Sequence, residues 1–173
     1  FSILISHSDD YRHFPFPQSN DMLAIISWTE NNFNRKITLE EVAKQIGYSK
    51  HYLCRKFKNE TGPEIARKLK EQGVDIVLCT GGCGTCHRSA TIVTRCCEEA
   101  GMSCCVIAAL PPIARQQGAP RITAPHVPIG SNAGEPNNIP MQTAIIKESL
   151  EWVRDCPSFN QTKVLPYEYR HNV

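Results

Sequence analysis

Apolar side chains between residues 21 and 62 recur at the spacing of helices that bury one face. The first such run contains Met22, Leu23, Ile26 and Phe33. A second helix is expected after Thr38, whose hydroxyl and backbone can form a capping box with Glu41. Gly47 is expected to end that helix, and Ser49 to cap a third one. The pattern predicts a three-helix bundle of helix-turn-helix dimensions.

The hydrophobic pattern changes at residue 63. A helix is expected to begin at Pro63 and to end at Gly73. The runs Val74–Cys79 and Cys104–Ala109 are almost continuously apolar, as in strands that are covered on both faces. A helix over about residues 87–100 separates them, so strand, helix and strand follow in order. This order predicts a Rossmann-like βαβ unit with a parallel sheet.

Residues 111–140 are rich in proline, glycine and asparagine and are expected to form one long loop. Because this segment follows the second strand, we expect it to lie over the glycine-rich turn that follows the first. Residues 141–153 have a helical pattern, and Lys163–Pro166 favour a short final strand.

The expected fold class is α plus α/β. A flexible arm at residues 1–20 precedes a helix-turn-helix module at residues 21–62. A Rossmann-like parallel-sheet domain follows at residues 63–173.

The composition of the chain argues against several classes of protein. The chain has 173 residues, of which 41% are hydrophobic, and a net charge of +2, which does not by itself indicate nucleic acid. Nine cysteines, an odd number clustered over residues 79–105, are not typical of a secreted disulfide framework. The opening run Phe1–Ile5 is too short for a signal peptide. No apolar run approaches the roughly 18 residues of a membrane span. We therefore expect a cytoplasmic protein.

The turn between the first strand and its helix carries the candidate chemistry. Amides at a helix N-terminus and nearby cations stabilise a thiolate, and a glycine backbone allows close approach. We expect Cys83 to be the nucleophile, and Cys86 to attack an adduct on Cys83 and release it. His87 and Arg88 are expected to supply nearby positive charge or hydrogen-bond donors to the thiol. We expect seven residues in all to support the loop and its substrate: Thr80, Gly81, Gly82, Gly84, Thr85, His87 and Arg88.

Two other interpretations of these cysteines stay open. One is a zinc site formed by Cys83, Cys86 and His87, with Cys79 or His126 as fourth ligand. Zinc is disfavoured because the chain has no second Cys-x-x-Cys pair, so no metal ligands are assigned. The other interpretation is that the cysteines are purely structural. A phosphate-binding loop is excluded, because no Gly-Lys-Ser/Thr follows the glycines.

The stretch from Ile37 to Gly62 resembles the first helix-turn-helix of AraC/XylS-type transcription regulators. That family has two such units, and only the first is visible here. The resemblance implies that the helix after Gly47 enters the DNA major groove. The implied DNA-binding residues are Ser49, Lys50, His51, Arg55, Lys56 and Lys58.

The loop Thr80–Cys86 is similar to the active-site loop of the selenoprotein B family of glycine, sarcosine, betaine and D-proline reductases. Segments near Pro111, Gly118 and Asn132 also look like this family. The resemblance implies reductive cleavage of a C–N bond, with attack by the residue at position 83 and release by Cys86. Many members have selenocysteine where this chain has Cys83, so selenocysteine at that position in the source stays open.

The resemblance also implies partners and a source of electrons. Such reductases are multi-subunit complexes, so other reductase subunits or a dithiol donor protein are expected, with a small amino-acid-like substrate. No cofactor is expected in this chain. The favoured function is a thiol-dependent redox protein of the reductase type. The alternative is an AraC-type DNA-binding transcription regulator that responds to redox state.

Overall fold

The computed structural model describes residues 20–170, apart from Phe33 and Pro157. Four side chains within this range also lie outside the description: Met22, Ile26, Phe57 and Lys58. The flexible arm that was expected at residues 1–20 falls almost wholly outside the described residues. No described helix is long and apolar enough to cross a membrane.

The N-terminal part contains α1 (Asn20–Asn32), α2 (Leu39–Gln45) and the beginning of α3 (Lys50–Glu71). The predicted capping box is confirmed: the Glu41 amide donates to Thr38 Oγ1 at 3.2 Å, and the Thr38 amide donates to Glu41 Oε2 at 2.9 Å. Ser49 caps α3 by accepting a hydrogen bond from the Tyr52 amide at 3.2 Å. The small core of this part is formed by Ile25, Val42, Ala43 and Leu53.

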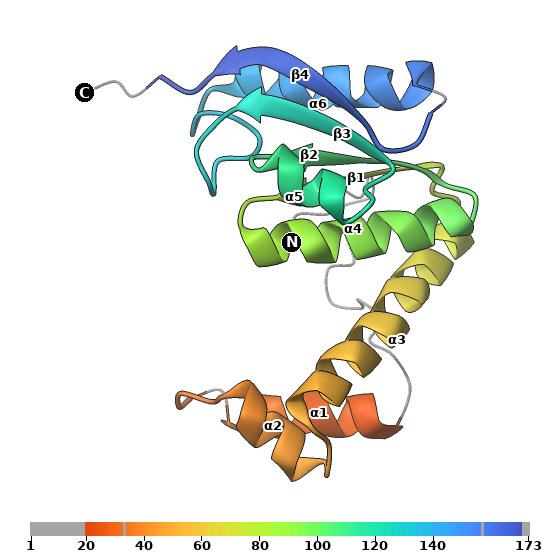
Figure 1. Ribbon diagram of the computed structural model, residues 1–173, viewed down its shortest axis with the longest axis vertical. Coiled ribbons are helices and arrows are strands. Elements are labelled where there is room, and N and C mark those ends of the chain that lie inside the picture. Colours follow the sequence, from red (N-terminus) through yellow and green to blue (C-terminus); the bar gives the residue numbers. More distant parts are fainter. Residues whose placement is uncertain (1–19, 33, 157, 171–173) are drawn as a thin grey trace.

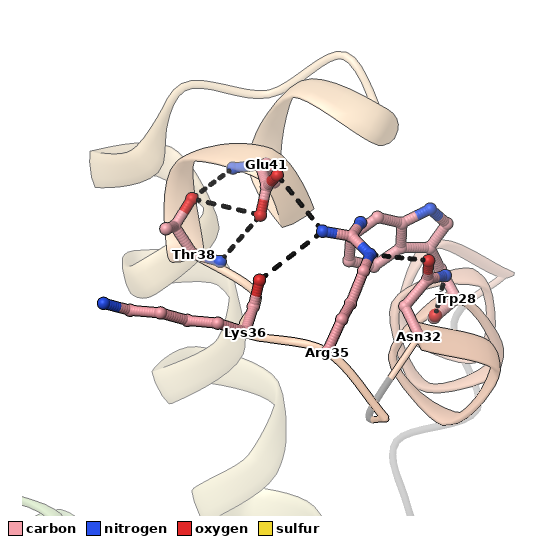
Figure 2. Close-up of polar contacts among 6 residues, drawn as sticks. All are labelled: Trp28, Asn32, Arg35, Lys36, Thr38 and Glu41. Carbon is pink, nitrogen blue, oxygen red and sulfur yellow. Dashed lines mark hydrogen bonds and ion pairs between the residues drawn. The ribbon is translucent and has the colours of Figure 1, made fainter.

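Arg35 connects the end of α1 to the start of α2 (Figure 2). Its guanidinium lies over the Trp28 ring, with Cζ 5.6 Å from the ring centroid. Arg35 Nε donates to Asn32 Oδ1 at 3.3 Å, and Nη1 donates to Glu41 Oε1 at 3.3 Å. One side chain therefore contacts the last turn of α1 and the capping box of α2.

The helix α3 runs without a break through Gly62 and Pro63 (Figure 1). The prediction that a new helix begins at Pro63 was therefore wrong. A proline inside a helix removes one backbone hydrogen bond and costs about 3 kcal/mol. Burial offsets this cost, because Leu53 packs in the N-terminal core while Ile65 and Leu69 pack in the core of the α/β part. Tertiary packing at both ends thus overrides the local signal.

The described residues of the C-terminal part form a four-stranded sheet in the order β1-β2-β3-β4, with every pair parallel. The strands are β1 (Ile76–Gly81), β2 (Ser103–Ala108), β3 (Arg121–His126) and β4 (Gln161–Glu168). The helices between them are α4 (Gly84–Glu99), α5 (Pro111–Gln116) and α6 (Ile139–Asp155). The predicted α plus α/β fold class is confirmed.

Both faces of this sheet are covered, as the apolar strands predicted (Figure 1). Val106 points toward α4 and the C-terminal half of α3, within the larger core. Its neighbour Ile107 points to the other face, where it packs with Ile145 of α6 and Leu165. The alternation along β2 makes it a central strand that is buried on both sides.

The prediction of one long loop over residues 111–140 was wrong, because α5 and β3 lie within it. Proline was the misleading signal. Pro111 stands at the start of α5, where the absent N–H costs nothing. Pro125 lies within β3, where the ladder to β4 shifts register between Ala124 and His126. A proline is tolerated at such an irregularity, because the ladder does not need its N–H there.

Candidate active site

The cysteine loop lies at the carboxyl end of β1, where it passes into the first turn of α4. Parallel α/β sheets bind their ligands at this edge. The structure joins Cys83 and Cys86 in a disulfide, with Cα atoms 5.0 Å apart. Cys83 is the N-cap of α4, and its Sγ accepts a hydrogen bond from the Cys86 amide at 3.2 Å. The Cys86 amide is therefore directed at Cys83 sulfur, and amides at a helix N-terminus favour the thiolate form of a cysteine.

His87 is completely buried beneath this loop. Its Nδ1 lies 2.6 Å from the carbonyl oxygen of Cys83, and its Nε2 accepts a hydrogen bond from the Leu110 amide at 2.9 Å. The sequence suggested that His87 supplies positive charge or hydrogen-bond donors to the thiol. The structure instead directs both ring nitrogens to backbone groups, so the ring braces the loop from below.

Two glycines allow the loop to pack closely on its supports. A Cβ added to Gly81 would lie 2.6 Å from Cδ2 of the His87 ring, and one added to Gly82 would lie 2.8 Å from the side-chain amide of Asn132. The hydrogen-bond pattern places the Asn132 amide oxygen 3.0 Å from the Gly82 N–H, with its nitrogen facing the Gly81 carbonyl at 3.3 Å. Gly84 differs, since its Cβ would lie 3.7 Å from Ile113.

The remaining predicted support residues have different surroundings. Thr80 is half-buried on β1, whereas Thr85 and Arg88 are exposed on the first two turns of α4. A zinc site would need a free nitrogen on His87, and both nitrogens face the backbone. Among the described residues, no three His, Cys, Asp or Glu side chains are grouped as a metal site requires.

A cavity of about 490 Å³ opens at the carboxyl ends of β2, β3 and β4, and no residue of the cysteine loop is among those that line it. Ala109 lies in its wall, and the Ala109 amide donates to the Gly81 carbonyl at 3.2 Å, which ties the cavity to the end of β1. The lining is mostly apolar, with His126 and Tyr169 as the polar contributors. The lining residues are Ala109, Pro111, Ala124, Pro125, His126, Val127, Pro128, Val164 and Tyr169.

The other seven cysteines are free. Burial raises the pKa of Cys79 to about 12 and that of Cys105 to about 12, so both stay protonated near neutral pH. A hydrogen bond with Cys97 is the first cause that raises the pKa of Cys104. Cys79, Cys104 and Cys105 are buried and behave as small apolar groups of the core.

The predicted DNA-binding residues lie on the first half of α3, and their surroundings differ. His51 and Arg55 are exposed, and the Arg55 guanidinium stacks over the Tyr52 ring at 5.6 Å. Lys50 Nζ lies 2.5 Å from Glu40 in an exposed ion pair. Ser49 serves as the N-cap, and the Lys58 side chain lies outside the described residues.

Lys56 does not face outward with the others. Its ammonium pairs with Glu60 at 2.7 Å and with Asp21 of α1 at 3.3 Å, and its side chain is only 18% exposed. The hydrogen bond to Glu60 is the first cause that raises the pKa of Lys56. This lysine links α1 to α3, whereas the family resemblance implied a contact with DNA.

Comparisons with known proteins match the N-terminal helices and the α/β part of the chain to different proteins. Residues 30–62 match the family of bacterial regulatory helix-turn-helix proteins, AraC family. The multiple antibiotic resistance protein MarA of Escherichia coli is 39% identical in an alignment of 66 residues, which covers 31% of this chain and 52% of MarA. The Transposon Tn10 TetD protein of Escherichia coli is 34% identical over 59 residues, covering 31% of this chain and 43% of that protein.

The D-proline reductase subunit gamma of Acetoanaerobium sticklandii is 60% identical over 115 residues. The match covers 66% of this chain and 48% of that subunit. The chain joins a reductase-related sequence to an AraC-type helix-turn-helix. Both resemblances noted in the sequence are thereby confirmed. The chain spans about half the length of the curated relatives it matches. No solved structure matches it.

Sequence reasoning missed two groups at the site. Asn132 faces the Gly81–Gly82 peptide, and the Leu110 amide binds His87. Two signals pointed toward Asn132: the family resemblance of the segment around it, and the expectation that the segment after the second strand covers the cysteine loop. A backbone amide such as that of Leu110 leaves no signal in a residue pattern.

Proposed function

We propose that the chain is a thiol-dependent reductase component that cleaves a C–N bond through Cys83, with Cys86 as the resolving thiol. Two observations support this proposal. The Cys83–Cys86 pair lies at the N-terminus of α4, with an amide directed at Cys83 Sγ. The relative that is 60% identical is a D-proline reductase subunit.

The proposed chemistry has two steps. The Cys83 thiolate attacks the carbon that bears the amine, so that a C–S bond forms while the C–N bond breaks and the amine leaves with a proton. The Cys86 thiolate then attacks Cys83 sulfur. An S–S bond forms, the C–S bond breaks, and the carbon takes the electron pair and a proton.

The net result is the transfer of two electrons from the dithiol to the substrate. An external dithiol then reduces the Cys83–Cys86 disulfide and is itself oxidised. The 5.0 Å separation of the two Cα atoms suits this cycle, because Cys86 reaches Cys83 sulfur without movement of the backbone.

The name of the relative suggests D-proline as substrate. The proposed binding site is the cavity at the carboxyl ends of β2, β3 and β4, because its mostly apolar wall can contact a saturated ring. Breaking the bond between the α-carbon and the ring nitrogen opens the ring to a linear amino acid. The proposed partners are other reductase subunits and a dithiol donor, and the proposed compartment is the reducing cytoplasm.

The test exploits the new primary amine, because proline itself is a secondary amine. The chain is mixed with the other reductase subunits, D-proline and a dithiol, and primary amine is followed with fluorescamine. Cys83→Ala should abolish the signal and Cys86→Ser should stop it within one turnover. Cys54→Ser, which changes an unpaired cysteine on α3, should leave it intact. The proposal fails if Cys83→Ala retains the rate.

A second function is supported by the match of residues 30–62 to the AraC family. We propose that the first half of α3 binds DNA, with His51 and Arg55 toward the bases. One module with few cations should bind weakly, and its affinity should fall steeply with salt. Titration of labelled duplex DNA at rising salt tests this. Equal binding by Arg55→Ala at low salt would contradict it, and Arg67→Ala, in the second half of α3, is the matched control.

A further inference from the structure

His87 connects the cysteine loop to the wall of the neighbouring cavity. On one side its Nδ1 lies 2.6 Å from the Cys83 carbonyl oxygen, and on the other its Nε2 accepts from the Leu110 amide at 2.9 Å. Leu110 lies between Ala109 and Pro111, which both line the cavity. The His87 side chain thus joins Cys83 to Leu110, whose two neighbours in the chain line the cavity.

These two contacts fix the tautomer of His87. The Leu110 group is an N–H donor, so Nε2 must carry a lone pair. The Cys83 group is a carbonyl acceptor, so Nδ1 must carry the hydrogen. An imidazolium would turn a second N–H toward the Leu110 amide. The surroundings therefore hold a neutral ring with its hydrogen on Nδ1.

The Cys83 carbonyl accepts a second hydrogen bond, from the His87 backbone amide at 3.0 Å, which is the first bond within α4. The His87 ring thereby reinforces the turn that directs the Cys86 amide toward Cys83 Sγ. The ring is completely buried, and Gly81 packs against it so closely that no Cβ fits between them. Its position is thus set from three sides.

We propose that His87 is a positioning residue that sets the Cys83 nucleophile against the cavity wall through its neutral Nδ1–H tautomer. The Nδ1 contact holds Cys83 at the helix N-terminus, and the Nε2 contact holds the wall at Leu110. This role rests on the proposed function of Cys83. It is tested by readouts that need no turnover, so failure of the proposed substrate would not affect them.

Two variants separate the two contacts. His87→Asn places an amide nitrogen near the position of Nδ1, and so keeps the donor to Cys83 while it loses the acceptor for Leu110. His87→Gln places an amide oxygen near the position of Nε2, and so keeps the acceptor while it loses the donor. His51→Gln, at an exposed histidine on α3, is the matched control.

Two readouts are taken on the reduced full chain. The first is the alkylation rate of Cys83 by iodoacetamide, mapped by peptide mass. It should fall about tenfold in His87→Gln and less than threefold in His87→Asn, because helix-terminal amides increase the thiolate fraction. The second is hydrogen exchange at the Leu110 amide, which should accelerate in His87→Asn and stay slow in His87→Gln.

Equal effects of the two variants on both readouts would overturn the proposal, because packing alone would then explain His87. If neither variant folds, the ¹⁵N chemical shifts of His87 in the unmodified chain decide the matter. Hydrogen on Nδ1 at neutral pH is the expected state. Hydrogen on Nε2, or an imidazolium, would overturn the proposal.

Discussion

Replacing Gly81 with alanine tests whether the buried His87 ring braces the cysteine loop. A Cβ at this position would lie 2.6 Å from Cδ2, 2.7 Å from Cγ and 2.9 Å from Nε2 of the ring. The ring cannot move away freely, because both of its nitrogens bind backbone groups. The substitution must therefore shift the loop or the ring.

The cost can be estimated from the structure. Overpacking by one methyl group in a tight core costs about 1–3 kcal/mol. Weakening the two hydrogen bonds of His87 adds roughly 1 kcal/mol. The expected loss is thus about 2–4 kcal/mol, which lowers the melting temperature by roughly 5–15 °C for a chain of this size.

Gly84→Ala is the matched control on the same loop. Its Cβ would lie 3.7 Å from Ile113 Cδ1, which is an ordinary contact. Gly84 is the first residue of α4, where alanine favours the helix by up to about 1 kcal/mol. Thermal unfolding followed by circular dichroism should show a large decrease for Gly81→Ala and none for Gly84→Ala. Equal melting temperatures for the two variants would refute the reasoning.

Three further predictions concern the scaffold. Thr38→Ala should lower the free energy of unfolding in urea by about 1 kcal/mol, because it removes the hydroxyl that accepts a hydrogen bond from the Glu41 amide. An unchanged midpoint of urea unfolding would contradict the capping role. Glu98→Ala should lower the free energy of unfolding by about 3–5 kcal/mol in the same measurement, because it leaves the buried Arg121 guanidinium without its carboxylate. The control is Glu99→Ala at the exposed neighbouring residue, which should lower it by less than about 0.5 kcal/mol. A hydrogen bond from Tyr167, followed by Lys163, holds the pKa of Glu148 below its usual value. The ionised Glu148 carboxylate therefore stabilises the fold at pH values above its pKa in the unfolded chain. This stabilisation is lost as the pH falls through the lower pKa that Glu148 has in the folded chain. Stability measured from pH 6 downward should fall less steeply in Glu148→Gln, and an identical slope would count against this contact.

The sequence predicted the elements whose side chains follow a clear period. The capping box at Thr38, the strands β1 and β2, and the fold class were all confirmed, although β1 is only partly buried. Local patterns failed where tertiary packing decides. Pro63 resembles the beginning of a helix, yet burial of both halves keeps α3 continuous. Pro125 resembles a loop residue, yet it lies where the β3–β4 register shifts.

The site was predictable to a similar extent. The order strand, glycine turn and helix located the Cys83–Cys86 pair, because those features are adjacent in sequence. The role of His87 was not predictable, since its partner Leu110 lies 23 residues further along the chain and contributes only a backbone amide. Lys56 was assigned to DNA from its position on the third helix. Its ion pair with Asp21 depends on how α1 packs, which the sequence pattern does not show.

The order of attack at the cysteine pair is the central claim, and thiol exchange with an aromatic disulfide tests it most directly. The reduced chain and its Cys83→Ser and Cys86→Ser variants react with 5,5′-dithiobis(2-nitrobenzoate), and the adducts are mapped by peptide mass. Cys86→Ser should retain a stable mixed disulfide on Cys83, whereas the unmodified chain should release the thiol and form the Cys83–Cys86 bond. Cys83→Ser should leave Cys86 to react at least tenfold more slowly. A mixed disulfide that forms first on Cys86 in the unmodified chain would contradict the account. So would equal reaction rates for Cys83 in Cys86→Ser and for Cys86 in Cys83→Ser.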